Sequence, residues 1–182
     1  INSTLAGILK VLKKKKQIVY SGFPGLDGVL KNKFVNLSNF SYSKIRDMGQ
    51  TPGSQYIGTT RVKKLSSDDI KKLNFILKRK NISNVINIGG NGSLKQSIHL
   101  SLKLPEINFV SCPKTVDNDL GDSVFSKMLF NPGFASCVEI WRFFLKMINI
   151  ENIGASSHDK IIISQTFGRD TGFICGSIRY WD

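Results

Sequence analysis

Short continuous apolar runs alternate along the chain with stretches whose apolar residues recur at helical spacing. Three runs, "NVINI" (84–88), "INFVSC" (107–112) and "KIIISQTF" (160–167), predict buried strands. Helical spacing predicts helices over residues 3–15, 66–79, 93–104, 134–148 and 168–181. Strands that are apolar on both faces favour a parallel sheet covered by helices on both sides. The pattern therefore predicts a three-layer α/β fold of Rossmann-like type, with a mostly parallel sheet.

The segment between the first two of these helices has a weaker pattern. "QIVYSGF" (17–23) is a short β-like run that ends at a glycine turn, and the residues after it are predicted to be irregular. "GQTPGSQYIGTTR" (49–61) is a Gly/Thr/Ser loop that ends on Arg61. Ser66 or Ser67 is the predicted cap of the following helix, with two aspartates in its first turn.

Length and composition narrow the class of protein. The 182 residues, 41% of them hydrophobic, suit one domain, or one domain and part of another. No apolar run approaches the roughly 20 residues that cross a bilayer, and the lysines 13–16 follow the first apolar stretch, the reverse of a signal peptide. Three cysteines without disulfide or metal-ligand spacing indicate a reducing compartment, and we expect the cytoplasm.

The formal net charge of +13 fits an anionic partner, and it equally fits a lysine-rich solvated surface without a binding role. Phosphorylated small molecules, nucleic acid and an anionic membrane would each fit such a charge. The lysines are spread along the chain, and no aromatic stripe runs between them as single-strand binding would favour. A basic nucleic-acid-binding domain is an alternative that rests on charge alone; we expect neither a nucleic-acid nor a membrane partner.

Three predicted strand ends carry residues suited to chemistry, and ligands of parallel sheets collect at such ends. "GGNGS" (89–93) precedes a helix; its glycines allow close backbone approach, and the helix N-terminus attracts phosphate. Ser93 could cap that helix or bind a phosphate oxygen. The plain alternative is a strand-to-helix turn, but three glycines in four positions are more than a turn requires.

The second end, "PKTVDNDL" (113–120), places a lysine, a threonine and two aspartates within six residues. Its plain alternative is a capped polar turn. It follows a strand one β-α unit after the glycine loop, so we expect both ends on the same rim of the sheet. A cation, a hydroxyl, a proton acceptor and a magnesium ligand beside a phosphate loop fit phosphoryl transfer. The third end, "FGRD" (167–170), offers Arg169 as a phosphate clamp or as a surface partner of Asp170.

Two other features are interpreted as structural. His99 lies within a helix and His158 precedes a strand, without zinc-ligand spacing. The helix over 134–148 is strongly apolar, and we expect a core or subunit contact from residues Trp141, Phe143, Phe144 and Met147.

In this order and spacing, "GGNGS", "PKTVDNDL" and "FGRD" resemble the phosphofructokinase family. The similarity extends to "GTTR" (58–61) and "INSTLAGI" (1–8), so it covers nearly the whole chain. The glycine loop alone would be weak, because lipid and NAD kinases carry a similar one. The P-K-T-x-D-N-D block is highly specific.

The resemblance implies a 6-phosphofructokinase that transfers a phosphoryl group to the 1-hydroxyl of fructose 6-phosphate in glycolysis, with Mg²⁺. It implies that Asp117 is the catalytic base, assisted by Thr115 and Arg169. Binding of the phosphoryl donor is implied for Arg61, Gly89, Gly90, Asn91, Gly92, Ser93 and Lys114. Sugar-phosphate binding is implied for Thr115, Asp117, Asp119, Lys160, Gly168 and Arg169, and metal binding for Asn91 and Asp119. A homo-oligomer, a dimer or tetramer, is expected, with Lys160 at a position that reaches a neighbouring subunit's sugar phosphate in many members.

The sequence departs from the family pattern at the donor site. Asn91 stands where an aspartate commonly helps to hold Mg²⁺, and an amide is a poorer ligand. Lys114 is typical of pyrophosphate-using members, whereas Gly92 leaves room for the α-phosphate of a nucleotide. We expect ATP as donor, with pyrophosphate as the alternative and a catalytically weak regulatory or phosphosugar-binding paralogue as a further one.

The resemblance also predicts the domain organisation. Residues 1–130 would form the donor domain, and residues 131–182 the beginning of a second, sugar-phosphate α/β domain. The family's first strand and G-G-x-x-P-G turn should lie just before Ile1. We therefore expect the chain to be a fragment of a longer protein.

Overall fold

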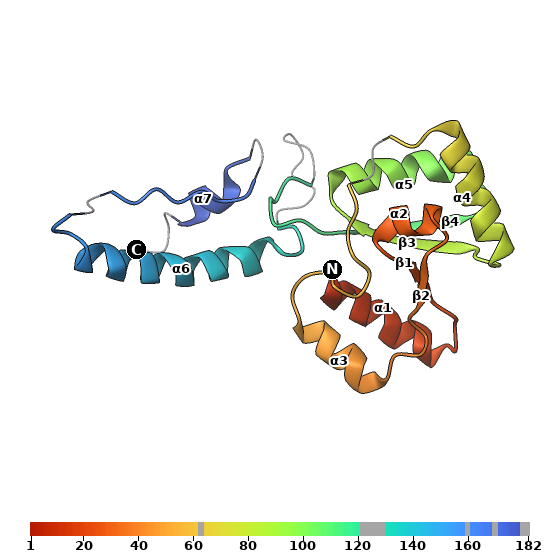
Figure 1. Cartoon of the computed structure of the whole chain (residues 1–182), viewed down its shortest axis with the longest axis horizontal. Helices are drawn as coiled ribbons and strands as arrows, with labels where there is room; N and C mark the ends of the chain where they lie inside the picture. Colours follow the sequence, from red (N-terminus) through yellow and green to blue (C-terminus); the bar gives the residue numbers. More distant parts are fainter. Residues whose placement is uncertain (62–63, 121–129, 159–160, 169–170, 179–182) are drawn as a thin grey trace. The chain divides into compact units, whose positions relative to one another are not determined.

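The computed structural model describes residues 1–61, 64–120, 130–158, 161–168 and 171–178 (Figure 1). The chain divides into two compact units, Ile1–Cys112 and Pro113–Asp182. The elements are, in chain order, α1 (Asn2–Lys14), β1 (Tyr20–Gly22), α2 (Gly25–Leu30), β2 (Phe34–Asn36), α3 (Tyr42–Gln50), α4 (Ser67–Arg79), β3 (Asn84–Gly89), α5 (Asn91–Lys103), β4 (Asn108–Pro113), α6 (Phe134–Gly154) and α7 (Phe173–Ile178). The functional boundary expected at residue 131 stays a prediction.

Two small sheets organise the first unit. β3 and β4 are neighbours that run parallel, with α5 as the crossover between them, as the apolar runs predict. β1 and β2 pair antiparallel, with Tyr20 opposite Asn36 and Gly22 opposite Phe34. The sequence pattern gave no sign of β2, because a three-residue strand carries too little alternation to be recognised.

Helices pack against both faces of β3. Ile88 contacts a core formed by α1 and α3, whose buried residues are Leu5, Ala6, Leu9, Leu37, Ile45 and Met48. Val85, on the other face of the strand, contacts a second core formed around α4 and α5, whose buried residues are Leu65, Leu73, Leu77, Leu100, Leu104 and Ile107. Figure 1 shows α1 beside α3, and α4 near α5. The expected three-layer α/β arrangement is confirmed.

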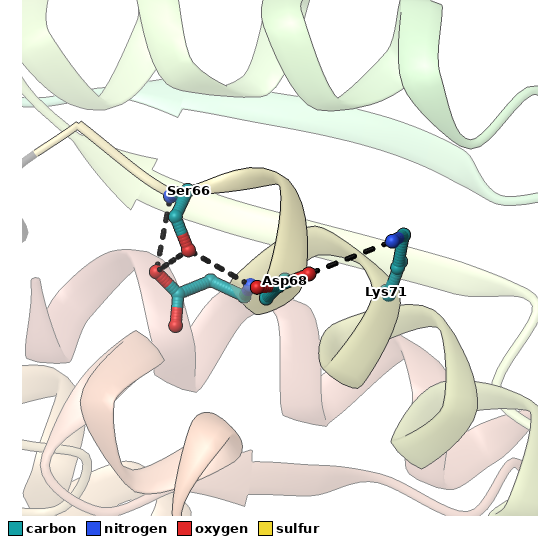
Figure 2. A network of polar contacts seen from close by, with 4 residues as sticks. Ser66, Asp68 and Lys71 are labelled. Carbon is teal, nitrogen blue, oxygen red and sulfur yellow. Dashed lines mark hydrogen bonds and ion pairs between the residues drawn. The ribbon is translucent and has the colours of Figure 1, made fainter.

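The N-terminus of α4 is fixed by a reciprocal cap (Figure 2). The Asp69 N–H donates to Ser66 Oγ at 3.1 Å, and Asp69 Oδ2 accepts from the Ser66 N–H at 3.0 Å. The Ser66 hydrogen bonds lower the pKa of Asp69. Figure 2 also shows the ion pair between Asp68 and Lys71, which is 3.5 Å long and exposed. The predicted helix and its cap are confirmed, with Ser66 as the capping residue.

Two expectations in the first unit were wrong. The segment after the glycine turn is not irregular throughout, since α3 forms there, with Ser41 Oγ accepting from the Lys44 N–H at 3.1 Å. Burial of Ile45 and Met48 against α1 compensates for the polar character of α3. Ser93 does not cap α5: the helix begins two residues earlier, and Gly90 is its N-cap.

In the second unit, α6 continues to Gly154, six residues beyond the predicted end. Its first two turns pack against α7, where Phe134, Val138 and Ile174 are buried. No helix in the described part of the chain combines the length and apolar character needed to span a membrane.

The strand predicted over 160–167 does not form in the described segment 161–168. Ile161 is 81% exposed and Ile163 is 91% exposed. A strand needs a hydrogen-bonded neighbour, and within the described ranges the sheets contain only the pairs β1–β2 and β3–β4. The apolar run is real, but the described residues provide no strand beside it.

Candidate functional site

The glycine loop joins β3 to the N-terminus of α5. Gly90 is the N-cap with an extended backbone, and no side chain caps the helix. The first-turn N–H groups and the positive end of the helix dipole therefore favour an anion there. Asn91 and Gly92 are exposed, and a Cβ built on Gly92 would meet nothing within 4 Å. The fold does not require glycine at 92, and the absence of a side chain leaves open space beside the N-terminus of α5.

Close packing fixes the base of this loop. Gly89 is buried, and a Cβ there would overlap the Ser93 side chain. Asn87 Nδ2 donates to Ser93 O at 3.0 Å and to Ser97 Oγ at 2.8 Å, and so ties β3 to the first turns of α5. Sequence reasoning missed Asn87, although an amide within an otherwise apolar strand was a visible signal.

The loop that ends on Arg61 is anchored by the first turn of α1. Asn2 is 1% exposed, and its Nδ2 donates to Thr51 O at 3.2 Å and to Gln55 Oε1 at 2.7 Å. Gly58, at the start of "GTTR", has φ +63°, a conformation that other residues rarely adopt. Arg61 itself is exposed. The start of "INSTLAGI" thus holds the loop before Arg61.

In the second unit, residues 114–120 form a loop that we call the acidic loop. It begins with Lys114, which is half-buried, and Thr115 holds it from within. The Thr115 N–H donates to Pro132 O at 3.2 Å, and Thr115 Oγ1 accepts from the Asp117 N–H at 3.1 Å. Asn118 has φ +56°, a left-handed conformation that asparagine tolerates better than most residues. Asp117 and Asp119, on either side of it, are both half-buried. The asparagine between the two acids therefore makes the turn that separates them.

Asn131 holds the far end of the acidic loop, and sequence reasoning missed it. It is 2% exposed. Its Oδ1 accepts from the Leu120 N–H at 2.8 Å, and its own N–H donates to Asn118 Oδ1 at 2.8 Å. Asn131 lies eleven residues from Leu120, outside any motif, so no local signal pointed to it.

The third predicted strand end meets the acidic loop. Thr171 Oγ1 donates to Asp117 O at 3.2 Å, so Thr171 contacts the backbone of the acidic loop. Gly168 has φ +118°, which favours glycine there. Arg169 and Lys160 lie outside the described residues. The backbone of Asp117 is thus bonded to Thr115 through its N–H and to Thr171 through its C=O.

Asp117 also lies close enough to the first turn of α6 to influence Cys137. Burial, and secondly the negative charge of Asp117, raise the pKa of the Cys137 thiol. The thiol is therefore protonated at neutral pH and is a poor nucleophile.

The family model described as Phosphofructokinase matches residues 1–177. The chain belongs to the phosphofructokinase family. The resemblance carried by "GGNGS", "PKTVDNDL" and "FGRD" is thereby confirmed, although the roles of the individual residues stay predictions.

The names of similar proteins give different phosphoryl donors. The chain is 29% identical over 173 residues to a Mycoplasma genitalium protein named "Probable ATP-dependent 6-phosphofructokinase", covering 93% of this chain and 49% of the relative. It is 25% identical over 186 residues to a pyrophosphate–fructose 6-phosphate 1-phosphotransferase of Xanthomonas campestris pv. campestris, covering 97% of this chain and 43% of the relative.

Solved phosphofructokinase structures show the same fold. The pyrophosphate-dependent phosphofructokinase of Marinobacter aquaeolei superposes with a TM-score of 0.86 at 24% identity, covering 100% of this chain and 46% of that one. Phosphofructokinase from Saccharomyces cerevisiae superposes with a TM-score of 0.72 at 18% identity, covering 95% and 25%. The chain therefore spans about half the length of the curated relatives it matches.

The described residues could bind Mg²⁺ only if the substrate supplied some of the ligands. Within the described ranges, no three His, Cys, Asp or Glu residues cluster as a metal site. Mg²⁺ is commonly held by one or two carboxylates together with substrate phosphates. Asp119 offers a half-buried carboxylate, and Asn91 an exposed amide. The glycine loop and the acidic loop belong to different units, so their expected adjacency stays a prediction.

Proposed function

We propose that this chain carries donor-binding and acceptor-binding elements of a 6-phosphofructokinase. The observation that carries the proposal is the acidic loop, in which the Asp117 N–H donates to Thr115 Oγ1 and the Asp117 carbonyl accepts from Thr171 Oγ1. A general base must be held in place by its surroundings, and the backbone that carries this carboxylate is held on both its N–H and its C=O side.

In the proposed reaction, Asp117 accepts the proton of the sugar 1-hydroxyl. The hydroxyl oxygen forms a bond to the terminal phosphorus of the donor, whose bond to the bridging oxygen breaks, so that ADP or phosphate leaves. Asp119, Gly168, Arg169 and Lys160 would bind the sugar phosphate, as in the implied family site. The arrangement supplies positioning and charge, which dominate catalysis of phosphoryl transfer.

The N-terminus of α5 is the proposed donor site. Its uncapped first turn would bind donor phosphates through backbone N–H groups, and Arg61 and Lys114 would add positive charge. Asp119 and Asn91 would hold Mg²⁺, which when bound neutralises charge on the transferring phosphate. Ser93 would contribute from within the helix and not as its cap.

ATP is the donor we favour. The open space around Gly92 leaves room for a phosphate that bears a nucleoside, and steric exclusion is harder to evade than an added charge. Lys114 and Asn91 support pyrophosphate, and relatives of both kinds exist. The amide at 91 is also the one observation that supports a catalytically weak regulatory or phosphosugar-binding paralogue.

The test of the activity is Asp117→Asn in the complete natural polypeptide. Loss of the base should lower kcat by on the order of 10²–10⁴, with little change in sugar binding. Asp47→Asn, an exposed aspartate on α3, is the control and should leave kcat unchanged. Steady-state assays with ATP and with pyrophosphate measure both. Near-normal turnover in Asp117→Asn would exclude the proposed base, and no turnover with either donor in the natural protein would favour the regulatory paralogue.

Two expectations on cellular context remain predictions. These are a cytoplasmic location and assembly as a dimer or tetramer. Mass measurement of the native protein and fractionation of its cells would test them.

A further inference from the structure

A cavity of about 210 Å³ lies in the first unit, where the end of α1 meets the segments before β1 and after β2 and the first turn of α3. Its wall includes Leu9, Leu37 and Ile45, which are all buried. None of the described residues that line it belongs to the glycine loop, the acidic loop or the loop that ends on Arg61. The proposed reaction therefore leaves this cavity unexplained.

Two lysines, Lys13 and Lys16, also line the cavity. Lys13 is half-buried, and its Nζ donates to Ser38 O at 3.0 Å and lies 5.5 Å from the centre of the Tyr42 ring. An ammonium group has three donors, so Lys13 keeps donors for a ligand. Lys16 is exposed, and in the part of the chain that the structure describes neither lysine pairs with a carboxylate. The lining therefore carries positive charge that no acidic side chain in contact with it balances.

Hydrogen bonds join the walls of the cavity without a ligand. The Val19 N–H donates to Ser38 Oγ at 2.7 Å, and the Leu37 N–H donates to Val19 O at 2.9 Å. These bonds connect the segment before β1 to the segment after β2, while Leu9 and Ile45 pack with Leu37 in the same core. A site that is formed in advance loses little free energy to ordering when a ligand binds.

The lining selects a ligand with an anionic head and an apolar body. A sugar phosphate would place hydroxyl groups against Leu9, Leu37 and Ile45, where they would lose their hydrogen bonds to water without replacement. A neutral hydrocarbon would leave the two ammonium groups of the lining without a partner. An amphipathic anion satisfies both parts of the wall.

Charge and volume narrow the ligand further. A singly charged carboxylate costs less to bring against apolar side chains than a doubly charged phosphate does. A cavity of about 150 Å³ engineered into another protein binds benzene, so the present cavity suits an apolar body of about six to eight carbon atoms.

We propose that this cavity is a binding site for a small amphipathic carboxylate. The apolar body of the ligand packs against Leu9, Leu37 and Ile45, and its carboxylate accepts hydrogen bonds from the ammonium groups of Lys13 and Lys16. The inference uses residues of the first unit alone and does not rest on the proposed function.

The test is calorimetric titration of the complete natural polypeptide with octanoate at physiological salt. We expect one saturable site per chain with a Kd below about 1 mM. Butyrate should bind at least ~10-fold more weakly, because its chain buries fewer methylene groups. Octanamide, which has the same chain without the charge, should bind at least ~5-fold more weakly. Octyl phosphate should bind no more tightly than octanoate.

Ile18 offers a variant within the lining. Its side chain is 70% exposed, so Ile18→Glu should fold, and the added carboxylate should repel octanoate and raise Kd at least ~10-fold. Val11→Glu, at an exposed position of α1 outside the lining, is the matched control and should change Kd by less than ~2-fold, because salt screens the more distant charge.

A second pair of variants keeps the test decisive if Ile18→Glu fails to fold. Lys16→Gln should raise the Kd of octanoate about 5-fold, since it removes one of the two cations that face the carboxylate. Lys15→Gln removes a neighbouring exposed cation outside the lining, and should leave Kd unchanged.

Methyl NMR locates the bound probe. Octanoate should shift the resonances of Leu9 and Leu37, and should leave those of Leu100 and Leu104, which belong to the other core of the first unit, unchanged. Binding is measured without turnover, so an inactive protein that binds octanoate would count against the proposed function and not against this site.

Five results would overturn the proposal. These are the absence of saturable binding, binding of butyrate or octanamide as tight as that of octanoate, tighter binding of octyl phosphate, a Kd indifferent to both Ile18→Glu and Lys16→Gln, and NMR shifts at Leu100 and Leu104 in place of Leu9 and Leu37.

Discussion

Asn131 illustrates how one buried amide can hold a loop in place. It binds both main-chain groups of Leu120, with the second contact from Nδ2 to Leu120 O at 3.4 Å. It also binds the side chain of Asn118. Leu120 is buried, so water cannot easily replace these partners. The position of Asp117 therefore depends on a residue that touches no substrate in the proposed reaction.

Asn131→Ala tests this dependence. The change leaves a buried N–H and C=O without partners, and it should lower the free energy of unfolding by about 1–3 kcal/mol. Activity should fall mainly in kcat, because the loop that carries the base is loosened. Urea unfolding and steady-state kinetics check both effects. Asn149→Ala, at an exposed position of α6, should stay within about 0.5 kcal/mol. A variant of Asn131 with unchanged stability and kcat would contradict the role.

The residues of the acidic loop were predictable from chemistry, whereas their supports were not. Two aspartates beside a lysine and a threonine are costly in a core, so the sequence alone indicated a site there. Asn131 lies 11 residues from its partner Leu120, and Thr171 lies 54 residues from its partner Asp117. The sequence around Asn131 and Thr171 contains no motif that predicts these contacts. The local sequence pattern shows the residue types and their periodicity. It does not show which side chain, distant in the sequence, will hydrogen-bond to a turn.

Among the elements, α4 has the clearest local signal, and it can be tested directly. Ser66→Ala removes the acceptor for the Asp69 N–H and the hydroxyl that donates to the Asp69 carboxylate, while the bond from the backbone N–H of residue 66 remains. Loss of such a cap should lower the free energy of unfolding by about 1 kcal/mol. Ser67→Ala, one residue into the helix, is the control and should have almost no effect. Denaturant titration of both variants is the measurement, and equal stability would mean that the cap contributes nothing.

The first turn of α5 is where donor choice can be altered. Gly92→Asp places a carboxylate in open space, so the fold should tolerate it. The carboxylate should repel the α-phosphate of a nucleotide, since like charges about 4 Å apart cost about a kcal/mol or more. We expect kcat/KM for ATP to fall much further than kcat/KM for pyrophosphate.

The control for this change is Gly7→Asp on α1, where a Cβ likewise meets nothing within 4 Å. It should alter neither donor's kinetics. If the natural protein already prefers pyrophosphate by about an order of magnitude, Gly92 was the wrong residue to rely on. Lys114 and Asn91 would then mark a pyrophosphate enzyme.

Elements were predictable where a local signal was strong. The cap of α4 and the apolar runs of β3 and β4 gave their positions to within a residue or two. α3 was missed because its sequence is polar and its stability depends on contacts of Ile45 and Met48 with α1. The segment 161–167 has the composition of a strand but forms none in the described part of the chain. A strand is defined by its neighbours, and composition cannot supply them.

At the scale of the whole molecule, the positive charge is unevenly distributed. Residues 1–112 contain 19 of the 26 Lys and Arg residues and 5 of the 13 acidic residues. The first unit, which carries the proposed donor loop, therefore accounts for all of the net positive charge. Such a unit attracts polyphosphates over a distance, and the attraction is screened by salt.

This distribution gives a prediction that separates small phosphates from nucleic acid. Binding to bulk duplex DNA should be weak and should vanish near physiological salt, because contacts to phosphate lose about 10³–10⁵ in affinity between 50 and 200 mM salt. Replacing Lys14, Lys15 and Lys16 by glutamine should reduce the residual binding without changing kcat. Fluorescence anisotropy over a salt series is the measurement. A sub-micromolar, sequence-selective complex at physiological salt would restore the nucleic-acid alternative.

The exposed run at 161–167 has a consequence for the life of the protein in a cell. An extended apolar segment of this kind is a typical substrate for chaperones and proteases, which act on unassembled chains. The abundance of a free copy would then be governed by degradation, and that of an assembled copy by synthesis. A pulse-chase measurement would show two lifetimes. The amplitude of the slower decay would give the fraction of chains in which these isoleucines are buried by a partner.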